Sequence, residues 1–211
     1  MSAAVTELPE DSAAEGTETL PQRRRLAWLM VVTGAVGFFA AAMLVWERLQ
    51  IYVDAGHVSS CDLNSLVNCG TVMRTSQAAA FGFPNPLIGI VAYAIILTIA
   101  TAMLAGARLA RWYWWCVQIG VTLGFVFICW LWYQTTFRID ALCLYCMIVW
   151  IVQTTLFVHV TVHNMRTGVI PVPRRVASAM TGWAWFLTVM ILLVLFGIIF
   201  IRFFSVITGM F

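Results

Sequence analysis

The sequence predicts an all-α integral membrane protein with five transmembrane helices, and three observations lead to this fold class. Of the 211 residues, 62% are hydrophobic and only 10% are charged, and the mean hydropathy is +0.92. Soluble domains carry about 25% charged residues, so a soluble core of this size would leave much apolar surface in water. The other two observations are five long apolar runs and an uneven placement of arginine between them.

The five apolar runs are the candidate helices. A helix needs about 20 apolar residues to cross a hydrocarbon core of about 30 Å, and each run reaches that length. The expected helices cover residues 26–48, 87–107, 112–136, 141–164 and 177–201. Pro84 and Pro86 set the start of the second helix, because proline interrupts the helical hydrogen-bond ladder.

The first 22 residues differ from the rest of the chain. They are small, polar and acidic and cannot bury a core, so we expect residues 1–22 to be a disordered tail. Residues 23–211 are then the membrane domain, with an outer loop that contains a half-helix over residues 50–85. The formal net charge of +3 is scattered between apolar blocks, which predicts a lipid bilayer and no nucleic acid as partner.

The arginines predict the orientation of the chain. Eight of the twelve basic residues fall before the first run, between the second and third runs, or between the fourth and fifth runs: Arg23, Arg24, Arg25, Arg108, Arg111, Arg166, Arg174 and Arg175. Loops rich in arginine stay in the cytoplasm. We therefore expect a multi-pass protein of the cytoplasmic (inner) membrane, with a cytoplasmic N-terminus and an extracytoplasmic C-terminus.

Four of the six cysteines fall on the extracytoplasmic side of this topology: Cys61, Cys69, Cys143 and Cys146. That compartment permits disulfides, and the orientation came from arginine alone, so the agreement is independent. Four cysteines allow three pairings. The simplest resting state joins residues 61 to 69 and 143 to 146, with crossed pairs as intermediates, and the first pair alone could also be a structural staple of the loop.

The other cysteines and the histidines are not expected to form a site. Cys116 and Cys129 are about 20 Å apart along the third helix and fit small buried hydrophobes. His159 and His163 have a spacing that could bind a metal, but solvated interfacial histidines are expected. Zinc held by the outer thiols and His57 is disfavoured in an oxidising compartment, so we predict no metal.

The stretch DALCLYCMIVW, residues 140–150, predicts a redox site. A Cys-x-x-Cys disulfide closes too small a loop to add much stability, and such pairs usually serve redox or metal chemistry. Asp140 is the expected N-cap, which places Cys143 in the first helical turn, where a thiolate, the attacking species in disulfide exchange, is stabilised. Cys146 lies one turn deeper, on the same face as Trp150, where a lipid-soluble quinone is the natural oxidant.

The stretch GTVMRTSQAAAFGFPNPLIG, residues 70–89, predicts a short amphipathic half-helix over the outer mouth of the bundle, with Phe81 on its apolar side. Gly82 and the prolines then turn the chain into the second helix. Asn85 is a polar group at a costly depth. It fits either a helix cap or an amide that hydrogen-bonds to a quinone carbonyl.

Three motifs in this order resemble the bacterial members of the vitamin K epoxide reductase family. They are CDLNSLVNC at residues 61–69, FGFPNPLIG at residues 81–89 and CLYC at residues 143–146. The resemblance covers about residues 26–165. It implies a four-helix bundle around a quinone of the menaquinone or ubiquinone type, with a fifth helix at the side.

The resemblance also implies separate roles for the four outer cysteines. Cys143 and Cys146 would form the active-site disulfide, with Cys146 nearest the quinone. Cys61 and Cys69 would shuttle electrons, because Cys69 exchanges with Cys143 and Cys61 meets the partner protein.

Several other residues are expected to bind the cofactor. Asn85 matches the family's quinone-contacting asparagine, Thr75 or Ser76 matches the family's hydroxyl residue, and Phe81 and Trp150 complete the set. Trp150 stands where vertebrate relatives carry tyrosine. An indole donates one hydrogen bond but lacks the phenol proton, which predicts little epoxide chemistry.

The expected function is therefore a quinone-dependent thiol oxidoreductase that supports disulfide bond formation. The sequence ends at Phe211, soon after the fifth run, so we expect the thioredoxin-fold partner to be a separate, DsbA-like protein rather than a fused domain. One alternative is a quinone epoxide reductase of the same fold. Another is a non-enzymatic membrane protein whose outer loops are stapled by two disulfides.

Overall fold

The protein is a bundle of long helices in a computed structural model that describes residues 20–54 and 56–208, the side chains of residues 205–208 excepted. Five helices are long and apolar enough to cross a membrane: α1 (Leu20–Val53), α3 (Pro86–Leu104), α4 (Arg111–Gln134), α5 (Leu144–Arg166) and α6 (Arg174–Thr208). The described residues contain no strand beyond an isolated bridge between Val67 and Leu142. The predicted all-α membrane fold with five spans is confirmed.

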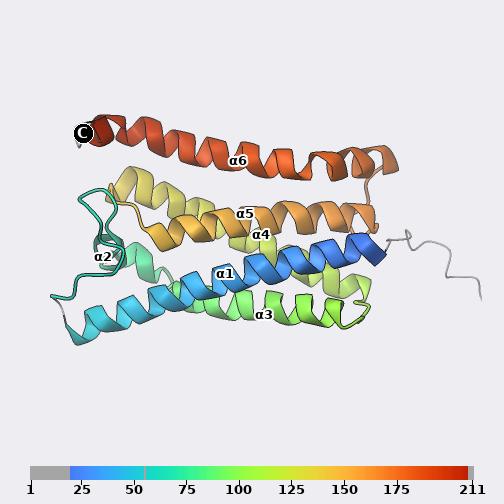
Figure 1. Ribbon diagram of the computed structural model, residues 1–211, viewed down its shortest axis with the longest axis horizontal. Coiled ribbons are helices and arrows are strands. Elements are labelled where there is room, and N and C mark those ends of the chain that lie inside the picture. Colours follow the sequence, from blue (N-terminus) through green and yellow to red (C-terminus); the bar gives the residue numbers. More distant parts are fainter. Residues whose placement is uncertain (1–19, 55, 209–211) are drawn as a thin grey trace, which may run out of the picture.

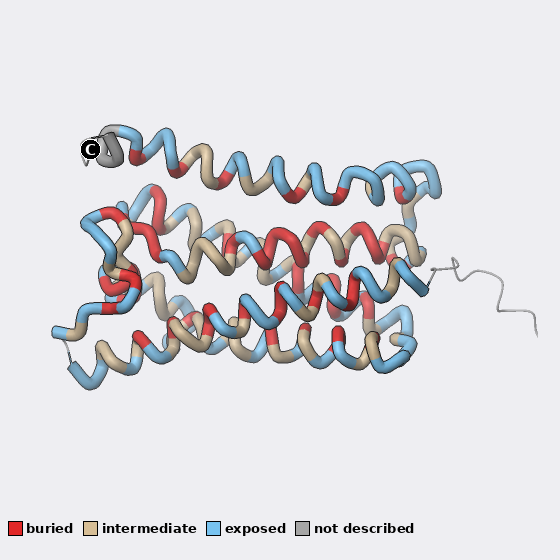
Figure 2. The backbone as a smooth tube through the Cα atoms, in the orientation of Figure 1, coloured by how far each residue is buried: buried red, intermediate tan, exposed pale blue. Residues whose placement is uncertain are grey.

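Four of these helices form the bundle and the fifth lies beside it. Helix α1 packs against α3 and α5, and α5 also packs against α4 and α6 (Figure 1). Buried residues face the interior between α1, α3, α4 and α5, whereas most of α6 is exposed (Figure 2). This is the predicted four-helix bundle with a peripheral fifth helix.

Small residues let the bundle helices approach closely. A Cβ atom on Gly37 of α1 would lie 2.6 Å from ring atoms of Tyr93 of α3, and one on Gly124 of α4 would lie 2.6 Å from Gln153 Nε2 of α5. Glycine at such contacts is typical of membrane helices, whose association depends on close packing rather than on the hydrophobic effect. The middle of the bundle is therefore tightly packed.

The cysteine-bearing end of the bundle, called the cysteine end below, holds α2, the connection into α5 and the C-terminal part of α6 (Figure 1). The N-terminal end of α1 lies at the opposite end of the bundle. The expected half-helix is split into a short helix α2 (Cys69–Met73) and a 3-10 turn η1 (Ser76–Ala79). Gly82, with a φ of 84°, then turns the chain toward α3.

Several helix ends differ from the prediction. Helix α1 begins at Leu20, so residues 20–22, expected in the tail, are helical, and the rest of that predicted tail lies outside the described residues. Helix α4 continues into a π-helical turn η2 (Thr135–Ile139), and α5 begins only at Leu144 instead of residue 141.

The sequence predicts Asp140 as the N-cap of α5, and this prediction is wrong. Asp140 ends η2 in the left-handed region with a φ of 55°, and its Oδ1 accepts a hydrogen bond from Arg202 Nη2 of α6 at 3.0 Å. The N-cap is Cys143 itself, so this cysteine precedes the first helical residue. The helix starts late because residues 141–142 are held extended by a neighbouring segment.

Candidate redox site

Two backbone hydrogen bonds align the segments that carry Cys69 and Cys143. Leu142 N donates to Leu66 O at 2.8 Å, and Asn68 N donates to Leu142 O at 2.9 Å, which makes the isolated parallel bridge between Val67 and Leu142. Each cysteine directly follows its bridged segment. The extended backbone that this pairing requires at residue 142 delays the start of α5, because a residue cannot be extended and helical at once.

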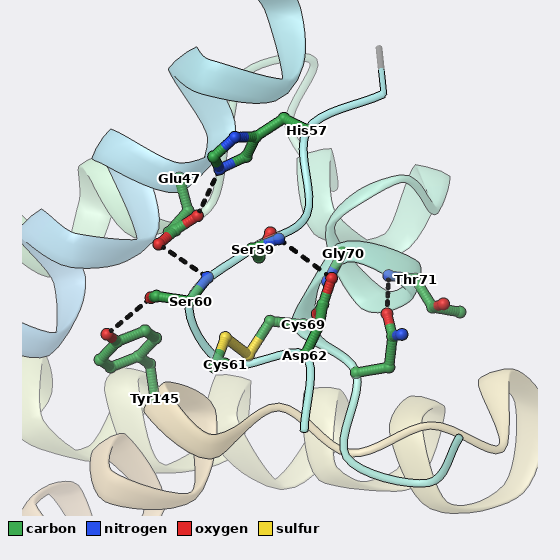
Figure 3. Close-up of a disulfide and its surroundings, with 11 residues drawn as sticks. Glu47, His57, Ser59, Ser60, Cys61, Asp62, Cys69, Gly70, Thr71 and Tyr145 are labelled. Carbon is green, nitrogen blue, oxygen red and sulfur yellow. Dashed lines mark hydrogen bonds and ion pairs between the residues drawn. A yellow bond between two sulfur atoms is a disulfide. The ribbon is translucent and has the colours of Figure 1, made fainter. Parts of the chain in front are cut away.

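The sulfur atoms of three cysteines gather at this point. Cys61 and Cys69 form a disulfide with their Cα atoms 5.7 Å apart, called the loop disulfide below (Figure 3). The Sγ atoms of Cys61, Cys69 and Cys143 all lie within 4.8 Å of one another. Cys143 and Cys146 are free thiols here. Two of the three clustered sulfurs are bonded to each other, and only thiolates are strong metal ligands, so this state suits sulfur exchange.

Asp62 ties together the two chain segments that carry the loop disulfide (Figure 3). Its Oδ2 accepts from Ser59 N at 3.1 Å and its Oδ1 accepts from Gly70 N at 2.9 Å. A Cβ atom on residue 70 would lie 2.8 Å from Oδ2, so only glycine leaves room for the carboxylate. These contacts do not involve sulfur, and they keep Cys61 near Cys69 when the disulfide opens.

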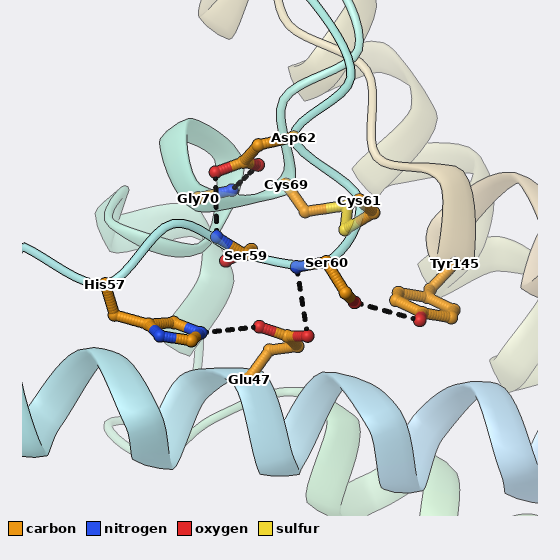
Figure 4. Close-up of polar contacts among 9 residues, drawn as sticks. All are labelled: Glu47, His57, Ser59, Ser60, Cys61, Asp62, Cys69, Gly70 and Tyr145. Carbon is orange, nitrogen blue, oxygen red and sulfur yellow. Dashed lines mark hydrogen bonds and ion pairs between the residues drawn. A yellow bond between two sulfur atoms is a disulfide. The ribbon is translucent and has the colours of Figure 1, made fainter.

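Glu47 of α1 holds the same loop from the other side (Figure 4). It is only 4% exposed, and its Oε1 accepts from Ser60 N at 3.1 Å while its Oε2 lies 3.0 Å from His57 Nε2. Ser60 Oγ in turn hydrogen-bonds to the hydroxyl of Tyr145 at 3.2 Å. Tyr145 lies between the two cysteines of the Cys-x-x-Cys motif, so this network connects α1, the loop and the start of α5.

The loop disulfide is covered. Cys61 is 1% exposed and Cys69 and Cys143 are 0% exposed. They pack in one apolar cluster with residues from α1, α2 and the connection into α5: Leu44, Val72, Met73 and Ala141. A thiolate from another protein can therefore reach Cys61 Sγ only after the loop around Ser60 has moved.

An apolar cavity opens beside Cys146. Its volume is about 150 Å³, and it runs between α1, α3, α4 and α5. Cys146 and Trp150 of α5 line it, together with Tyr93 of α3 and Phe127 of α4. Its apolar walls suit a flat, lipid-soluble ring with a few polar atoms.

The cavity separates the residues that sequence reasoning grouped together. Thr75, Asn85 and Trp150 line it, whereas Ser76 and Phe81 are exposed and are not among its lining residues. Phe81 stacks instead on Phe83, and its ring lies tilted against that of Phe127. Of the two hydroxyl residues that the spacing left open, the threonine is the one at the cavity.

Asn85 and Trp150 are both buried in the cavity wall. Asn85 Nδ2 donates to Gln77 O at 2.7 Å and its Oδ1 accepts from Ala80 N at 2.9 Å. The amide therefore folds the turn before α3, and one N–H group remains for a ligand. Asn85 stands at the N-cap position of α3 but makes no side-chain cap hydrogen bond. Trp150 is 1% exposed and packs against Phe196 of α6.

Three charged residues of the site were not predicted from the sequence: Glu47, Arg48 and Asp62. The first two follow the first apolar run directly, where charged groups are expensive at membrane depth and usually have a function. That position was the available signal. Asp62 gave none, because an aspartate beside a cysteine in a loop is unremarkable until its two backbone partners are known.

A dithiol at the start of a transmembrane helix, a disulfide within sulfur contact and an apolar cavity behind them define a membrane-embedded thiol–disulfide exchange protein. Comparison with family models gives the same answer. Residues 28–161 match the model of the Vitamin K epoxide reductase family, and the chain belongs to this family. Its members are quinone-linked thiol oxidoreductases, so an oxidoreductase of this kind is supported here. No curated protein was found to match the chain.

Proposed function

We propose that this protein oxidises the dithiol of a separate, extracytoplasmic DsbA-like thioredoxin-fold partner and passes the electrons to a membrane quinone, which supports disulfide bond formation. One observation carries the proposal. Cys143 Sγ lies within 4.8 Å of both sulfurs of the loop disulfide, while Cys146, one helical turn further, lines the apolar cavity. A continuous route for two electrons therefore leads from the loop to the cavity.

The first exchange takes place at the loop. A partner thiolate attacks Cys61 Sγ and releases Cys69 as a thiolate, and the second partner thiol then resolves the mixed disulfide. The partner leaves oxidised, and Cys61 and Cys69 are both reduced. Asp62 keeps these two cysteines together through Ser59 N and Gly70 N while no bond joins them.

The second exchange takes place at the start of α5. Cys69 attacks Cys143 of a Cys143–Cys146 disulfide and releases Cys146, and Cys61 then resolves the bond between residues 69 and 143. The result is a loop disulfide and a reduced Cys-x-x-Cys pair, which is the state that the structure describes.

The last step regenerates the Cys143–Cys146 disulfide, and the pair gives up two electrons and two protons. A bound quinone supplies a two-electron acceptor that takes up two protons. Asn85, Thr75 and Trp150 line the cavity beside Cys146 and are proposed to hold this group, which can be of the menaquinone or the ubiquinone type. We also propose that the cysteine end faces the extracytoplasmic side of the cytoplasmic membrane, as the arginine placement predicts.

The test uses purified protein in detergent with a reduced thioredoxin-fold protein, dithiothreitol as a small dithiol, and a short-chain quinone. Cys146→Ala should reduce quinone at least 100-fold more slowly than the unchanged protein, whereas Cys116→Ala, which removes an exposed cysteine of α4, should be unaffected. Normal quinone reduction by Cys146→Ala would refute the scheme.

Trapping of reduced thiols by alkylation in cells, with and without quinone, tests the rival in which both disulfides are only structural. In that case all four thiols stay oxidised whatever the state of the quinone pool.

A further inference from the structure

Arg48 has two hydrogen-bond donors that no described residue uses. It lies near the C-terminal end of α1 and is one of the residues that line the cavity. Its Nε and Nη1 atoms are buried and have no partner among the residues that the structure describes. Buried polar groups in native proteins are almost always hydrogen-bonded, so two unpaired guanidinium N–H groups at a cavity wall call for a partner.

The contacts that Arg48 does make hold its side chain in place. Its Nη2 donates to the Tyr52 hydroxyl at 3.2 Å, and its Cζ lies 5.0 Å from the centre of the Tyr52 ring. The neighbouring carboxylate of Glu47 is directed to His57 and Ser60 (Figure 4). The guanidinium is thus anchored at one nitrogen while its other two nitrogens remain available.

The surroundings of these donors select the chemistry of the ligand. The cavity walls are mainly apolar side chains, so the missing acceptor has to enter with the ligand. A quinone carries carbonyl oxygens that only accept hydrogen bonds. The Asn85 amide, which the sequence reasoning put forward for this task, already uses its oxygen and one N–H group within the turn at residues 77–85.

We propose that Arg48 is a quinone-binding residue whose Nε and Nη1 groups donate to a carbonyl oxygen of the quinone. This inference rests on the proposed function. Oxidation of the Cys143–Cys146 pair to its disulfide releases two electrons and two protons, which a bound quinone would accept. The fixed positive charge of Arg48, in a site of low dielectric, would stabilise negative charge on a carbonyl oxygen that it contacts.

The test measures binding rather than turnover. Equilibrium dialysis in detergent gives the dissociation constant of menadione for the unchanged protein and for Arg48→Met, Arg48→Gln and Arg48→Lys. A charge-assisted hydrogen bond contributes enough that Arg48→Met should weaken binding about 10- to 100-fold. Arg48→Lys keeps the charge without the planar guanidinium. Its dissociation constant should lie between those of the unchanged protein and Arg48→Met.

Two controls isolate the contact. Arg138→Gln removes an exposed arginine of η2 that does not line the cavity and should bind menadione as the unchanged protein does. Methylnaphthalene has the ring system of menadione without its carbonyl oxygens, and it should bind equally weakly to all variants. Circular dichroism and thermal unfolding identify any variant that does not fold, and the remaining Arg48 variants then decide.

The outcomes separate this inference from the proposed function. If menadione binds the unchanged protein and Arg48→Met equally well, the role of Arg48 is wrong and the proposed function stands. The same holds if Arg48→Met changes only the retention of anionic lipid, which would make a lipid phosphate the acceptor. If the unchanged protein neither binds nor reduces any quinone, the proposed function fails first.

Discussion

The cysteine end and the middle of the bundle are held together in different ways. At the cysteine end, carboxylates accept hydrogen bonds from backbone N–H groups of a loop. Glu47 accepts from Ser60, and Asp62 accepts from Ser59 and Gly70. In the middle, helices approach until a Cβ atom on Gly37 would strike the ring of Tyr93. The cysteine end is thus held by a few hydrogen bonds to a loop. The part of the bundle that surrounds the cavity is held by close packing of helices.

Polar side chains also join α4 and α5. Gln118 Nε2 donates to Thr161 Oγ1 at 2.9 Å, and Asn164 Nδ2 donates to Gln118 Oε1 at 2.9 Å. These hydrogen bonds between side chains hold the two helices together. At the cysteine end, by contrast, the polar partners are mostly backbone groups of a loop.

The largest effect is expected from overpacking the middle of the bundle. Gly37→Ala places a Cβ atom 2.6 Å from Tyr93 ring atoms, so α1 and α3 must separate, and overpacking of this kind costs about 1–3 kcal/mol. Thermal unfolding in detergent should show a clear loss of stability. Gly182→Ala of α6, where an added Cβ meets nothing within 4 Å, is the matched control and should be neutral. Equal stability of the two variants would contradict the close packing described here.

The next effect concerns the Asp62 contacts. Asp62→Ala removes both acceptors, and hydrogen bonds to a charged group contribute about 1.5–3 kcal/mol each. After reduction, re-formation of the loop disulfide should slow about tenfold or more, because the two cysteine segments separate. Alkylation of the remaining free thiols at timed intervals stops the reaction and measures this rate. Asp62→Asn keeps one carbonyl acceptor, and its rate should lie between those of the unchanged protein and Asp62→Ala. An unchanged rate in Asp62→Ala would show that the disulfide alone holds the two segments together.

Loosening the loop from the α1 side should have a smaller effect in the opposite sense. Glu47→Ala frees Ser60 N and His57, so the loop opens more often and dithiothreitol should reduce the loop disulfide about three- to tenfold faster. Glu47→Gln retains an acceptor for Ser60 N and should show a smaller increase. A slower reaction in Glu47→Ala would mean that Cys61 is exposed by some movement other than that of this loop.

The smallest effect is expected for Tyr145→Phe. It removes one hydrogen bond, between the phenol and Ser60 Oγ, worth about 1 kcal/mol at most for an exposed neutral pair. Reduction of the loop disulfide should accelerate about two- to threefold in the same dithiothreitol assay. Ser60→Ala should reproduce this change, and the double variant should add nothing further if the two residues act through one contact.

Much of the fold could be predicted from local composition, because a membrane span is a local property of about 20 residues. All five spans were placed within a few residues of their observed bounds, apart from the longer ends of α1 and α6. The family could also be predicted, since three short motifs carried it, and the match over residues 28–161 confirms it.

The start of α5 could not be predicted in the same way. Asp140 has the side chain of a good N-cap, but its neighbours at residues 141–142 pair with residues 66–68, which lie far away in the sequence. This tertiary pairing overrides the local preference. For the same reason, the unused donors of Arg48 and the two backbone partners of Asp62 were invisible, because each depends on segments that only the fold brings together.

The buried position of Cys61 limits which thiols can react with the loop disulfide. A small free thiol reaches Cys61 only when the loop opens, since Cys61 is 1% exposed in the loop that Glu47 and Asp62 hold in place. Under the proposed function, a protein partner would displace that loop with part of its binding free energy. Recognition of the partner, and not chemical reactivity alone, would then decide which thiols pass electrons to the quinone.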